Sequence, residues 1–216
     1  MKSILSTRNL KPYQRDLLLG QGFSLVDYDA IEIQFIDFKM PSEIENGIFT
    51  SQNGVNAILK TDYSINNCFC VGQKTKALLE GNSLKVIETA NYGADLAQII
   101  ANKYKERTFY FFCGEQRRDE IPDTLKTSNI EFIEVNTYKT ILKPRRYEQK
   151  WDGILFYSPS GVESYFTLNK TVDSTTTLFC IGETTANAAK KHSDNIVVST
   201  TTSVESVIKK AVETLK

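Results

Sequence analysis

Short apolar runs alternate with amphipathic stretches along the whole chain, and this alternation is the main structural signal in the sequence. The stretches between the runs repeat their apolar positions every three or four residues, as amphipathic helices do. Strands that alternate with helices are typical of parallel sheets covered by helices, so the pattern predicts an α/β fold. The expected strands are 3–7, 23–28, 47–51, 68–72, 84–88, 108–113, 130–135, 153–158, 177–182 and 195–199.

Several residues mark where the expected helices begin and end. Pro12 suits the first turn of a helix, where a missing N–H costs nothing, and Gly20 follows three leucines as a stop signal. Thr202 and Glu205 have the spacing of a capping box in front of the last helix. The apolar stripe of that helix is expected to be core: Val204, Val207, Ile208, Ala211, Val212 and Leu215.

The two halves of the 216-residue chain resemble each other, which predicts an internal duplication. The segment GIFTSQNGVNAIL (47–59) matches ILFYSPSGVESYF (154–166) at an offset of 107 residues. The segment FCVGQKTKALLEG (69–81) matches FCIGETTANAAKK (179–191) at an offset of 110 residues. Two copies are too few for a solenoid, which needs at least three repeats. The alternation of strands and helices within each copy predicts about five strands of a parallel sheet per copy.

Two equivalent stretches, YDAIEIQFIDF (28–38) and VNTYKTILKP (135–144), are extended and alternate in polarity, with a proline close behind. They are expected to be connectors that could pair as a two-stranded ladder. The pattern alone leaves two organisations open. The domains could follow one another along the chain, or each domain could take strands from both halves.

Composition and charge exclude several classes of protein. The chain has 26 Lys plus Arg against 26 Asp plus Glu, so no clustered basic surface for nucleic acid is expected. One His and four Cys lack the spacing of a structural zinc site, and the cysteines lie in apolar runs where free thiols are buried. In the first residues, MKSILSTR, the apolar run before Arg8 is too short for a secretory signal. No apolar run elsewhere is long enough to span a bilayer. We therefore expect a cytoplasmic protein without bound metal.

Polar residues follow most of the expected strands, and this is where open parallel sheets bind ligands. The helix N-termini that begin there offer unpaired N–H groups to anions. For any single Ser or Thr, an ordinary N-cap role is the alternative interpretation. As a set, these residues favour a shared cleft for an extended polyanionic small molecule. They are Thr7, Arg8, Ser51 to Asn53, Gly72 to Thr75, Gly114 to Arg118, Ser158 to Gly161 and Gly182 to Thr185.

Other familiar motifs are incomplete or absent. VGQKTK (71–76) lacks the glycine spacing of a phosphate loop, and no strand is followed by Gly-x-Gly-x-x-Gly. His192 is expected to be solvated or to cap a helix, and Arg117 and Arg118 form a pair of the kind that is usually solvated. Tyr138, in the second connector, is a phenol that could donate a proton at neutral pH. The alternative for Tyr138 is packing across the ladder.

The chain resembles the uroporphyrinogen-III synthase family over essentially its full length. The order and spacing of several segments carry this resemblance more than any one motif does. These segments are TSQNGVNA (50–57), VGQKTKALLEG (71–81), FFCGEQRRDEIPDTLKTSNIEF (111–132), VNTYKT (135–140), FYSPSGVES (156–164) and IGETTANAA (181–189).

The resemblance implies two flavodoxin-like domains with parallel sheets, joined by a two-stranded ladder. One domain would be discontinuous, formed by residues 1–30 and 145–216, and the other would span 37–136, with connector strands at 31–36 and 137–144. The implied activity is that of a cyclising lyase of porphyrin biosynthesis. It converts linear hydroxymethylbilane into uroporphyrinogen III, with loss of water and inversion of ring D through a spiro intermediate. No cofactor is implied, and a monomer is expected.

Residue by residue, the resemblance implies a catalytic role for Tyr138, which would protonate the leaving hydroxyl. The sequence departs from the family pattern at Gln52, where the second copy keeps Ser-Pro at Ser158. Two alternatives are a non-enzymatic two-lobed protein that binds an anionic small molecule and, less favoured, a nucleotide-sugar transferase. The expected substrate-binding positions combine Thr7 and Arg8, from the strand ends, with the carboxylate-binding positions that the resemblance implies, which are Ser51, Thr75, Arg118, Ser158, Ser160, Gly161, Thr184 and Thr185.

Overall fold

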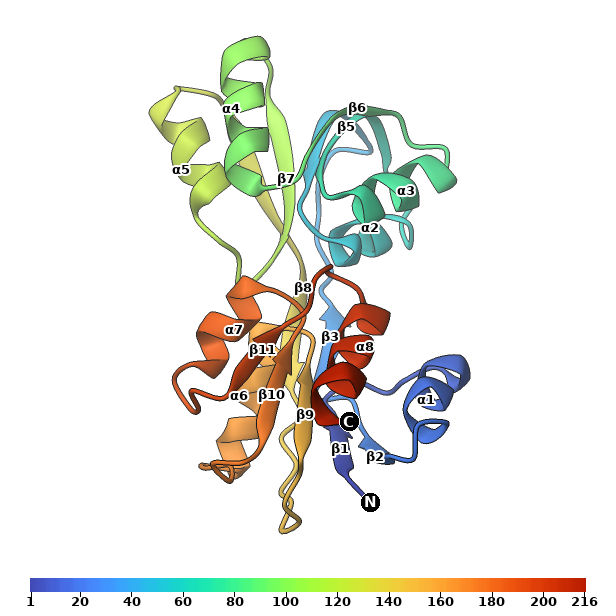
Figure 1. Ribbon diagram of the computed structural model, residues 1–216. Coiled ribbons are helices and arrows are strands. Elements are labelled where there is room, and N and C mark those ends of the chain that lie inside the picture. Colours follow the sequence, from blue (N-terminus) through green and yellow to red (C-terminus); the bar gives the residue numbers. More distant parts are fainter. The chain divides into compact units, whose positions relative to one another are not determined.

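A computed structural model that describes residues 1–216 contains eleven strands and eight helices (Figure 1). The strands are β1 (Ser3–Ser6), β2 (Ser24–Asp27), β3 (Ile31–Phe35), β4 (Glu43–Phe49), β5 (Ser64–Val71), β6 (Val86–Ala90), β7 (Phe109–Gly114), β8 (Phe132–Leu142), β9 (Gly153–Phe156), β10 (Thr177–Cys180) and β11 (Ile196–Val198). The helices are α1 (Pro12–Leu19), α2 (Gln52–Ile58), α3 (Gln73–Gly81), α4 (Gly93–Lys103), α5 (Glu120–Thr127), α6 (Pro159–Leu168), α7 (Glu183–Ala189) and α8 (Val204–Leu215).

The chain divides into two compact units. The first unit contains Met1–Glu32 and Ile141–Lys216, and the second contains Ile33–Thr140. The chain therefore leaves the first unit in β3 and returns to it in β8. Each unit has its own sheet and its own core, and each draws strands from both halves of the sequence.

The sheets of the two units share one strand order. The first runs β2-β1-β9-β10-β11, and all its neighbours are parallel. The second runs β8-β7-β4-β5-β6, also parallel, with β3 added at the β8 edge. When β7 and β8 are counted first and second, both sheets have the order 2-1-3-4-5 of flavodoxin-like folds. The predicted α/β class is confirmed, whereas the duplication itself stays a prediction.

Side chains alternate between the two faces of each strand, and helices cover both faces. In the first unit, Ile4 and Leu155 pack on one face with α1 and α8. Leu5, Ile154 and Phe156 pack on the other face with α6 and α7. This double burial explains why the strands are continuous apolar runs rather than alternating ones.

The second unit is built in the same way. Ile48 and Phe111 pack with α4 and α5, whereas their neighbours Phe49 and Phe112 pack with α2 and α3. The rings of Phe49 and Phe112 stack with centroids 4.9 Å apart. Burying each such ring contributes roughly 1.5–3 kcal/mol to folding, so this core fixes the strand ends beside it.

The second connector is longer and more regular than the sequence indicated. The expected strand at 130–135 and connector at 137–144 form one strand, β8, because neither Gly nor Pro interrupts the segment. The peptide N–H of Lys143 donates to Ala30 O at 2.8 Å, and that of Ile36 donates to Thr137 O at 3.0 Å. These partners run in opposite directions, so β3 and β8 form an antiparallel ladder.

The expected capping box at the last helix is wrong. The N-cap of α8 is Ser203, whose hydroxyl oxygen accepts from the peptide N–H of Ser206 at 3.1 Å. The Glu205 carboxylate is instead engaged by α1, where Tyr13 and Gln14 donate to Oε1 at 2.8 Å and 2.6 Å. The Glu205 side chain, which the local pattern assigned to the capping box, thus forms a tertiary contact with α1 instead.

All four cysteines are free and buried, as the apolar runs predicted: Cys68, Cys70, Cys113 and Cys180. None of the eight helices combines the length and the apolar character that a membrane span requires.

Candidate functional site

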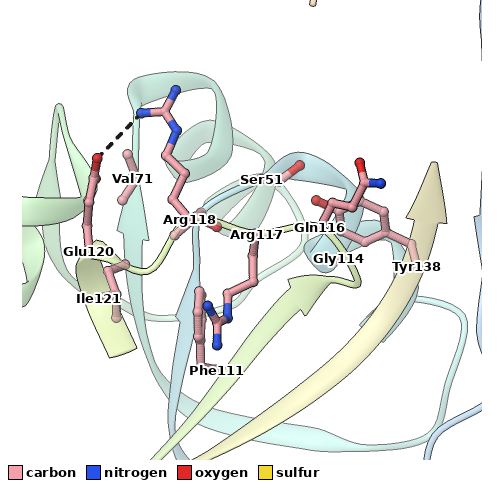
Figure 2. Close-up of a pocket in the computed structure, with 12 residues that line it drawn as sticks. Ser51, Val71, Phe111, Gly114, Gln116, Arg117, Arg118, Glu120, Ile121 and Tyr138 are labelled. Atoms are coloured by element: carbon pink, nitrogen blue, oxygen red, sulfur yellow. Dashed lines mark ion pairs between the residues drawn. The ribbon is translucent and has the colours of Figure 1, made fainter. Parts of the chain in front are cut away.

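A pocket of about 360 Å³ opens in the second unit at the carboxyl ends of β4, β5 and β7 (Figure 2). The adjacent strands β4 and β7 flank the topological switch point of this sheet, where ligands of doubly wound folds bind. The position of the pocket therefore follows from the strand order. It is lined by Thr50, Ser51, Val71, Gly93, Phe111, Gly114, Gln116, Arg117, Arg118, Glu120, Ile121 and Tyr138.

Tyr138 reaches this pocket because of a bulge in β8. Cys113 pairs with Asn136, but the next residue, Gly114, pairs with Tyr138, so Thr137 is an extra residue. The Thr137 hydroxyl donates to Cys113 O at 3.2 Å and fixes the bulge. A bulge re-aims the side chains that follow it, and the Tyr138 ring lies directly against Gly114.

Arg117 holds the loop between β7 and α5. Its Nε and Nη2 donate to the two carboxylate oxygens of Glu134 at 2.7 Å and 2.9 Å, and Asp119 is a further partner. The hydrogen bond to Glu134 raises the pKa of Arg117. Bidentate pairing of this kind fixes geometry as well as charge. Arg117 therefore acts as an anchor whose charge is already balanced within the protein.

Arg118 is the more available cation of the pair. Its side chain is 62% exposed, and its one ion pair, with Glu120, spans 3.7 Å (Figure 2). Exposed pairs of this length contribute little, so a carboxylate of a ligand can replace Glu120 at small cost. The expectation that both arginines are solvated is correct for Arg118 and wrong for Arg117, which pairs across the loop.

Ser51 directly precedes α2 and is the N-cap residue of this helix. Its hydroxyl oxygen accepts from the peptide N–H of Asn53 at 3.1 Å. The hydroxyl hydrogen is still free to donate to a ligand in the pocket. Thr75, by contrast, is only 5% exposed in the first turn of α3 and does not line the pocket.

The first unit gathers hydroxyl groups at its own switch point, between β1 and β9. The Ser158 hydroxyl oxygen caps α6 by accepting from the peptide N–H of Gly161 at 3.0 Å. Thr7 is 5% exposed and donates its hydroxyl hydrogen to Leu155 O at 2.7 Å. A Cβ on Gly161 would lie 3.3 Å from Ser158 Oγ and 3.5 Å from Thr7 Oγ1. These three residues are therefore packed together.

The other expected residues of the first unit differ in exposure. Ser160 is half-buried in the first turn of α6, and Arg8 is exposed after β1. In the first turn of α7, Thr184 is exposed, whereas Thr185 is 1% exposed. Thr185, like Thr75, is buried, so neither side chain is accessible to a ligand in this structure.

The structure thus brings Ser51, Arg118 and Tyr138 together in one pocket. Sequence reasoning placed Gln116 and Arg117 in the cleft as part of the segment 114–118 but named neither as a binding residue, and it missed Glu120. Their sequence position indicated a possible role in the site, because they lie in or next to the loop that follows an apolar strand. Their partners could not be foreseen, because Glu134 is distant in sequence from Arg117.

A family profile and two protein relatives match this chain in sequence. The family profile described as "Uroporphyrinogen-III synthase HemD" matches residues 16–209. The chain is 27% identical over 186 residues to "Uncharacterized protein RP474" of Rickettsia prowazekii, covering 82% of this chain and 64% of that protein. It is 30% identical over 131 residues to "Porphyrin biosynthesis protein HemD" of Ruminiclostridium josui, covering 56% of this chain and 26% of that protein. The chain thus spans less than two thirds of the length of either relative.

Two solved structures share the fold. Uroporphyrinogen-III synthetase from Helicobacter pylori 26695 superimposes with a TM-score of 0.74 at 15% identity, covering 99% of this chain and 100% of that one. A mutant uroporphyrinogen III synthase from the extremely thermophilic bacterium Thermus thermophilus gives a TM-score of 0.67 at 12% identity, with 100% of both chains covered. At such low identities the likeness concerns the fold.

Proposed function

Because the chain belongs to the uroporphyrinogen-III synthase family, we propose that it cyclises hydroxymethylbilane to uroporphyrinogen III, with loss of water and inversion of ring D. The observation that carries this proposal is the pocket at the switch point of the second unit. There a phenol, Tyr138, and an available cation, Arg118, lie beside the capping hydroxyl of Ser51. These groups suit a substrate that must lose a hydroxyl and that carries many carboxylates.

Tyr138 is proposed as the general acid. Departure of the hydroxyl from the first ring is easier when a proton is delivered to that oxygen, and the phenol hydroxyl of Tyr138 has a hydrogen to donate. The resulting azafulvene is attacked by the already substituted carbon of the last ring, which forms a spiro intermediate. This intermediate then fragments and recloses with the last ring inverted.

The main task of the protein is conformational. Hydroxymethylbilane cyclises unaided to the uninverted isomer, so the enzyme must hold the conformer that leads through the spiro route. Many weak anchors along the substrate serve this better than one strong one. We propose that its carboxylates bind Arg118 and Ser51 in the second unit, and Arg8, Ser158, Ser160, Gly161 and Thr184 in the first.

Three of the expected substrate-binding residues are proposed to have a different role. Thr7, Thr75 and Thr185 are each at most 5% exposed, so their proposed contribution is to shape the adjoining loops and helix N-termini. The peptide N–H groups of those termini can meet carboxylates directly. No bound metal or cofactor is invoked in these steps.

We also propose that the two compact units are the two domains expected from the sequence, with β3 and β8 as the connector strands. A cytoplasmic monomer is the proposed state of the protein. Its four free, buried thiols suit a reducing compartment.

One assay tests the activity. Hydroxymethylbilane is supplied to the purified chain, the products are oxidised, and type III and type I porphyrins are quantified. Predominantly type III product, formed faster than in a blank, is expected. Type I product alone at the spontaneous rate overturns the proposal. If linear tetrapyrrole then still binds, the chain is a non-enzymatic binding protein instead.

A further inference from the structure

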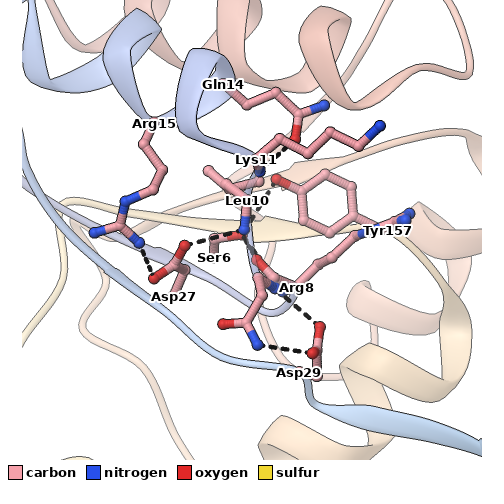
Figure 3. Close-up of polar contacts among 10 residues, drawn as sticks. Ser6, Arg8, Leu10, Lys11, Gln14, Arg15, Asp27, Asp29 and Tyr157 are labelled. Carbon is pink, nitrogen blue, oxygen red and sulfur yellow. Dashed lines mark hydrogen bonds and ion pairs between the residues drawn. The ribbon is translucent and has the colours of Figure 1, made fainter.

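Arg8 is a cation without a partner in a loop that is otherwise tightly held (Figure 3). It lies between β1 and α1, its side chain is exposed, and its guanidinium makes no ion pair. Two carboxylates, those of Asp27 and Asp29, belong to the same network. A carboxylate this close in the fold would ordinarily pair with the Arg8 guanidinium. Asp27 and Asp29 instead bind other groups.

Asp29 binds the residue that follows Arg8. One of its carboxylate oxygens accepts from the peptide N–H of Asn9 at 2.9 Å, and the other accepts from Asn9 Nδ2 at 2.7 Å (Figure 3). Both oxygens of the carboxylate are thus used on one residue. Hydrogen bonds to a charged acceptor are among the stronger ones in proteins.

Asp27 binds the next residue, Leu10, with one of its two carboxylate oxygens. Its Oδ2 accepts from the peptide N–H of Leu10 at 3.0 Å, and its Oδ1 pairs with Arg15 on α1. The negative charge of Asp27 is therefore balanced by Arg15 rather than by Arg8. The consecutive peptide N–H groups of Asn9 and Leu10 are held by two separate carboxylates.

Arg8 itself is held on the other side through its backbone. The Ser6 hydroxyl donates to Arg8 O at 2.6 Å, and Tyr157 OH lies 3.3 Å from Ser6 Oγ (Figure 3). Since the single hydrogen of Ser6 goes to Arg8 O, the Tyr157 hydroxyl is the donor in the second contact. A chain of hydrogen bonds thus runs from Tyr157, just after β9, through Ser6 of β1 to the backbone of Arg8.

We infer that Asp27 and Asp29 are positioning residues that hold the loop so that the Arg8 guanidinium meets a carboxylate of the substrate. This inference rests on the proposed function. The carboxylates act on the backbone next to Arg8, which leaves the guanidinium itself unneutralised. A loop ordered before binding loses less conformational entropy when the ligand arrives, so the benefit is expected in affinity rather than in the chemical step.

A double-mutant cycle on the full chain tests the coupling. Arg8→Ala is expected to raise KM about tenfold, the loss expected for one charged hydrogen bond. Asp29→Ala is expected to raise KM about threefold, because the guanidinium is then presented less often. In the double variant, removing Asp29 adds no further increase, since no guanidinium remains to be positioned. The value of kcat is expected to change much less than KM.

Two variants separate positioning from a general loss of structure or charge. Asp29→Asn keeps one acceptor for the Asn9 peptide N–H, so its KM is expected between those of wild type and Asp29→Ala. Asp16→Asn removes an exposed carboxylate from α1 and is expected to leave KM unchanged. KM effects of Arg8→Ala and Asp29→Ala that multiply in the double variant overturn the inference. So does an unchanged KM in Asp29→Ala.

A binding titration distinguishes failure of this inference from failure of the proposed reaction. Uroporphyrin I, a polycarboxylate, is titrated against wild type, Arg8→Ala and Asp29→Ala by porphyrin fluorescence. Wild type that binds it in an Arg8- and Asp29-dependent way without converting hydroxymethylbilane overturns the reaction and supports the inference. Wild type that converts substrate with no dependence on Arg8 overturns the inference alone. Absence of both activities overturns both.

Discussion

A Cβ placed on Gly114 would lie 2.7 Å from Cε2 and 2.9 Å from Cζ of Tyr138. The phenol ring thus occupies the space that any larger residue at position 114 would need. The backbone of Gly114 is not in the left-handed region, so the requirement for glycine is steric. The bulge at Thr137 and this close approach together determine where the Tyr138 hydroxyl lies.

Gly114→Ala is therefore expected to displace Tyr138 and to lower kcat roughly 10- to 100-fold, since a shift of about 1 Å in a reacting group can cost that much. Overpacking should also reduce the free energy of unfolding by about 1–3 kcal/mol. The rate of type III product and urea unfolding measure the two effects. Gly81→Ala is the matched control, because a Cβ there meets nothing within 4 Å. A wild-type rate in Gly114→Ala would contradict the proposed role of Tyr138.

Tyr138→Phe removes the proposed acid and keeps the ring. We expect kcat to fall about 10- to 100-fold, at or below the lower end of the usual effect of general acid catalysis, because this leaving group departs readily. The product should remain mostly type III, since the conformer is held by other groups. Porphyrin isomer analysis at several enzyme concentrations measures both. Activity equal to wild type would remove the acid role.

Arg118→Ala is expected to raise KM about three- to tenfold, because one exposed carboxylate contact is lost. Stability should hardly change, since the exposed pair with Glu120 contributes at most about 1 kcal/mol. Steady-state kinetics and thermal unfolding provide the two measurements. Arg146→Ala removes the same charge from the first unit and serves as the control. Equal KM values in the two variants would exclude Arg118 from binding.

Ser158→Ala removes the N-cap of α6. The peptide N–H of Gly161 then loses its side-chain acceptor and keeps only the Ser158 carbonyl oxygen, and the free energy of unfolding should fall by about 1 kcal/mol. Ser160→Ala in the same turn does not touch the cap and is expected to retain wild-type stability. Urea unfolding of both variants tests this difference. If the two variants unfold at the same urea concentration, the hydroxyl of Ser158 has no capping role.

The buried thiols predict a loss of stability at alkaline pH. Burial raises the pKa of Cys68 and Cys180 to about 12 and that of Cys113 to about 11, whereas unfolded thiols have a pKa of about 8.5. Between these values the folded state binds more protons, so the stabilisation is complete below about pH 8.5 and is lost as pH rises through the folded pKa values. Urea unfolding at neutral pH and at about pH 10.5, between the unfolded and folded pKa values, measures the loss.

Cys180→Ala is the matched variant for this prediction and should lose less stability between the two pH values than wild type. Ellman's reagent gives an independent test at mildly alkaline pH. The native protein should react slowly, and all four thiols should react after unfolding. Immediate reaction of the native protein would show that the thiols are accessible.

Parts of the candidate site follow from local sequence. Ser51 and Ser158 could be placed at strand ends because an apolar strand stops just before each of them, and polar residues with glycine begin a helix there. Arg118 could be placed near a ligand because it follows the strand at 108–113. In each case the carboxyl end of a parallel strand defines the edge of the sheet, and this is a local property of the chain.

Local sequence does not predict which arginine pairs with which carboxylate. Arg117 and Arg118 are neighbours in sequence and look equivalent, yet only Arg117 pairs with Glu134 on β8. Likewise, Arg15 pairs with Asp27 while Arg8 is left unpaired. Which carboxylate faces which cation depends on strand register, and a bulge of one residue changes it.

The α/β class, the positions of the buried strands and the family follow from the sequence, because apolar periodicity and ordered segments are local signals. The apolar pattern left open which strands pair, and the folded chain joins β1 and β2 with β9 to β11, and β7 and β8 with β4 to β6. Only the tertiary structure decided that Tyr138 lies against Gly114. Strand neighbours and side-chain contacts result from packing between residues far apart in the chain, and neither periodicity nor composition encodes which of several compatible apolar strands will pair.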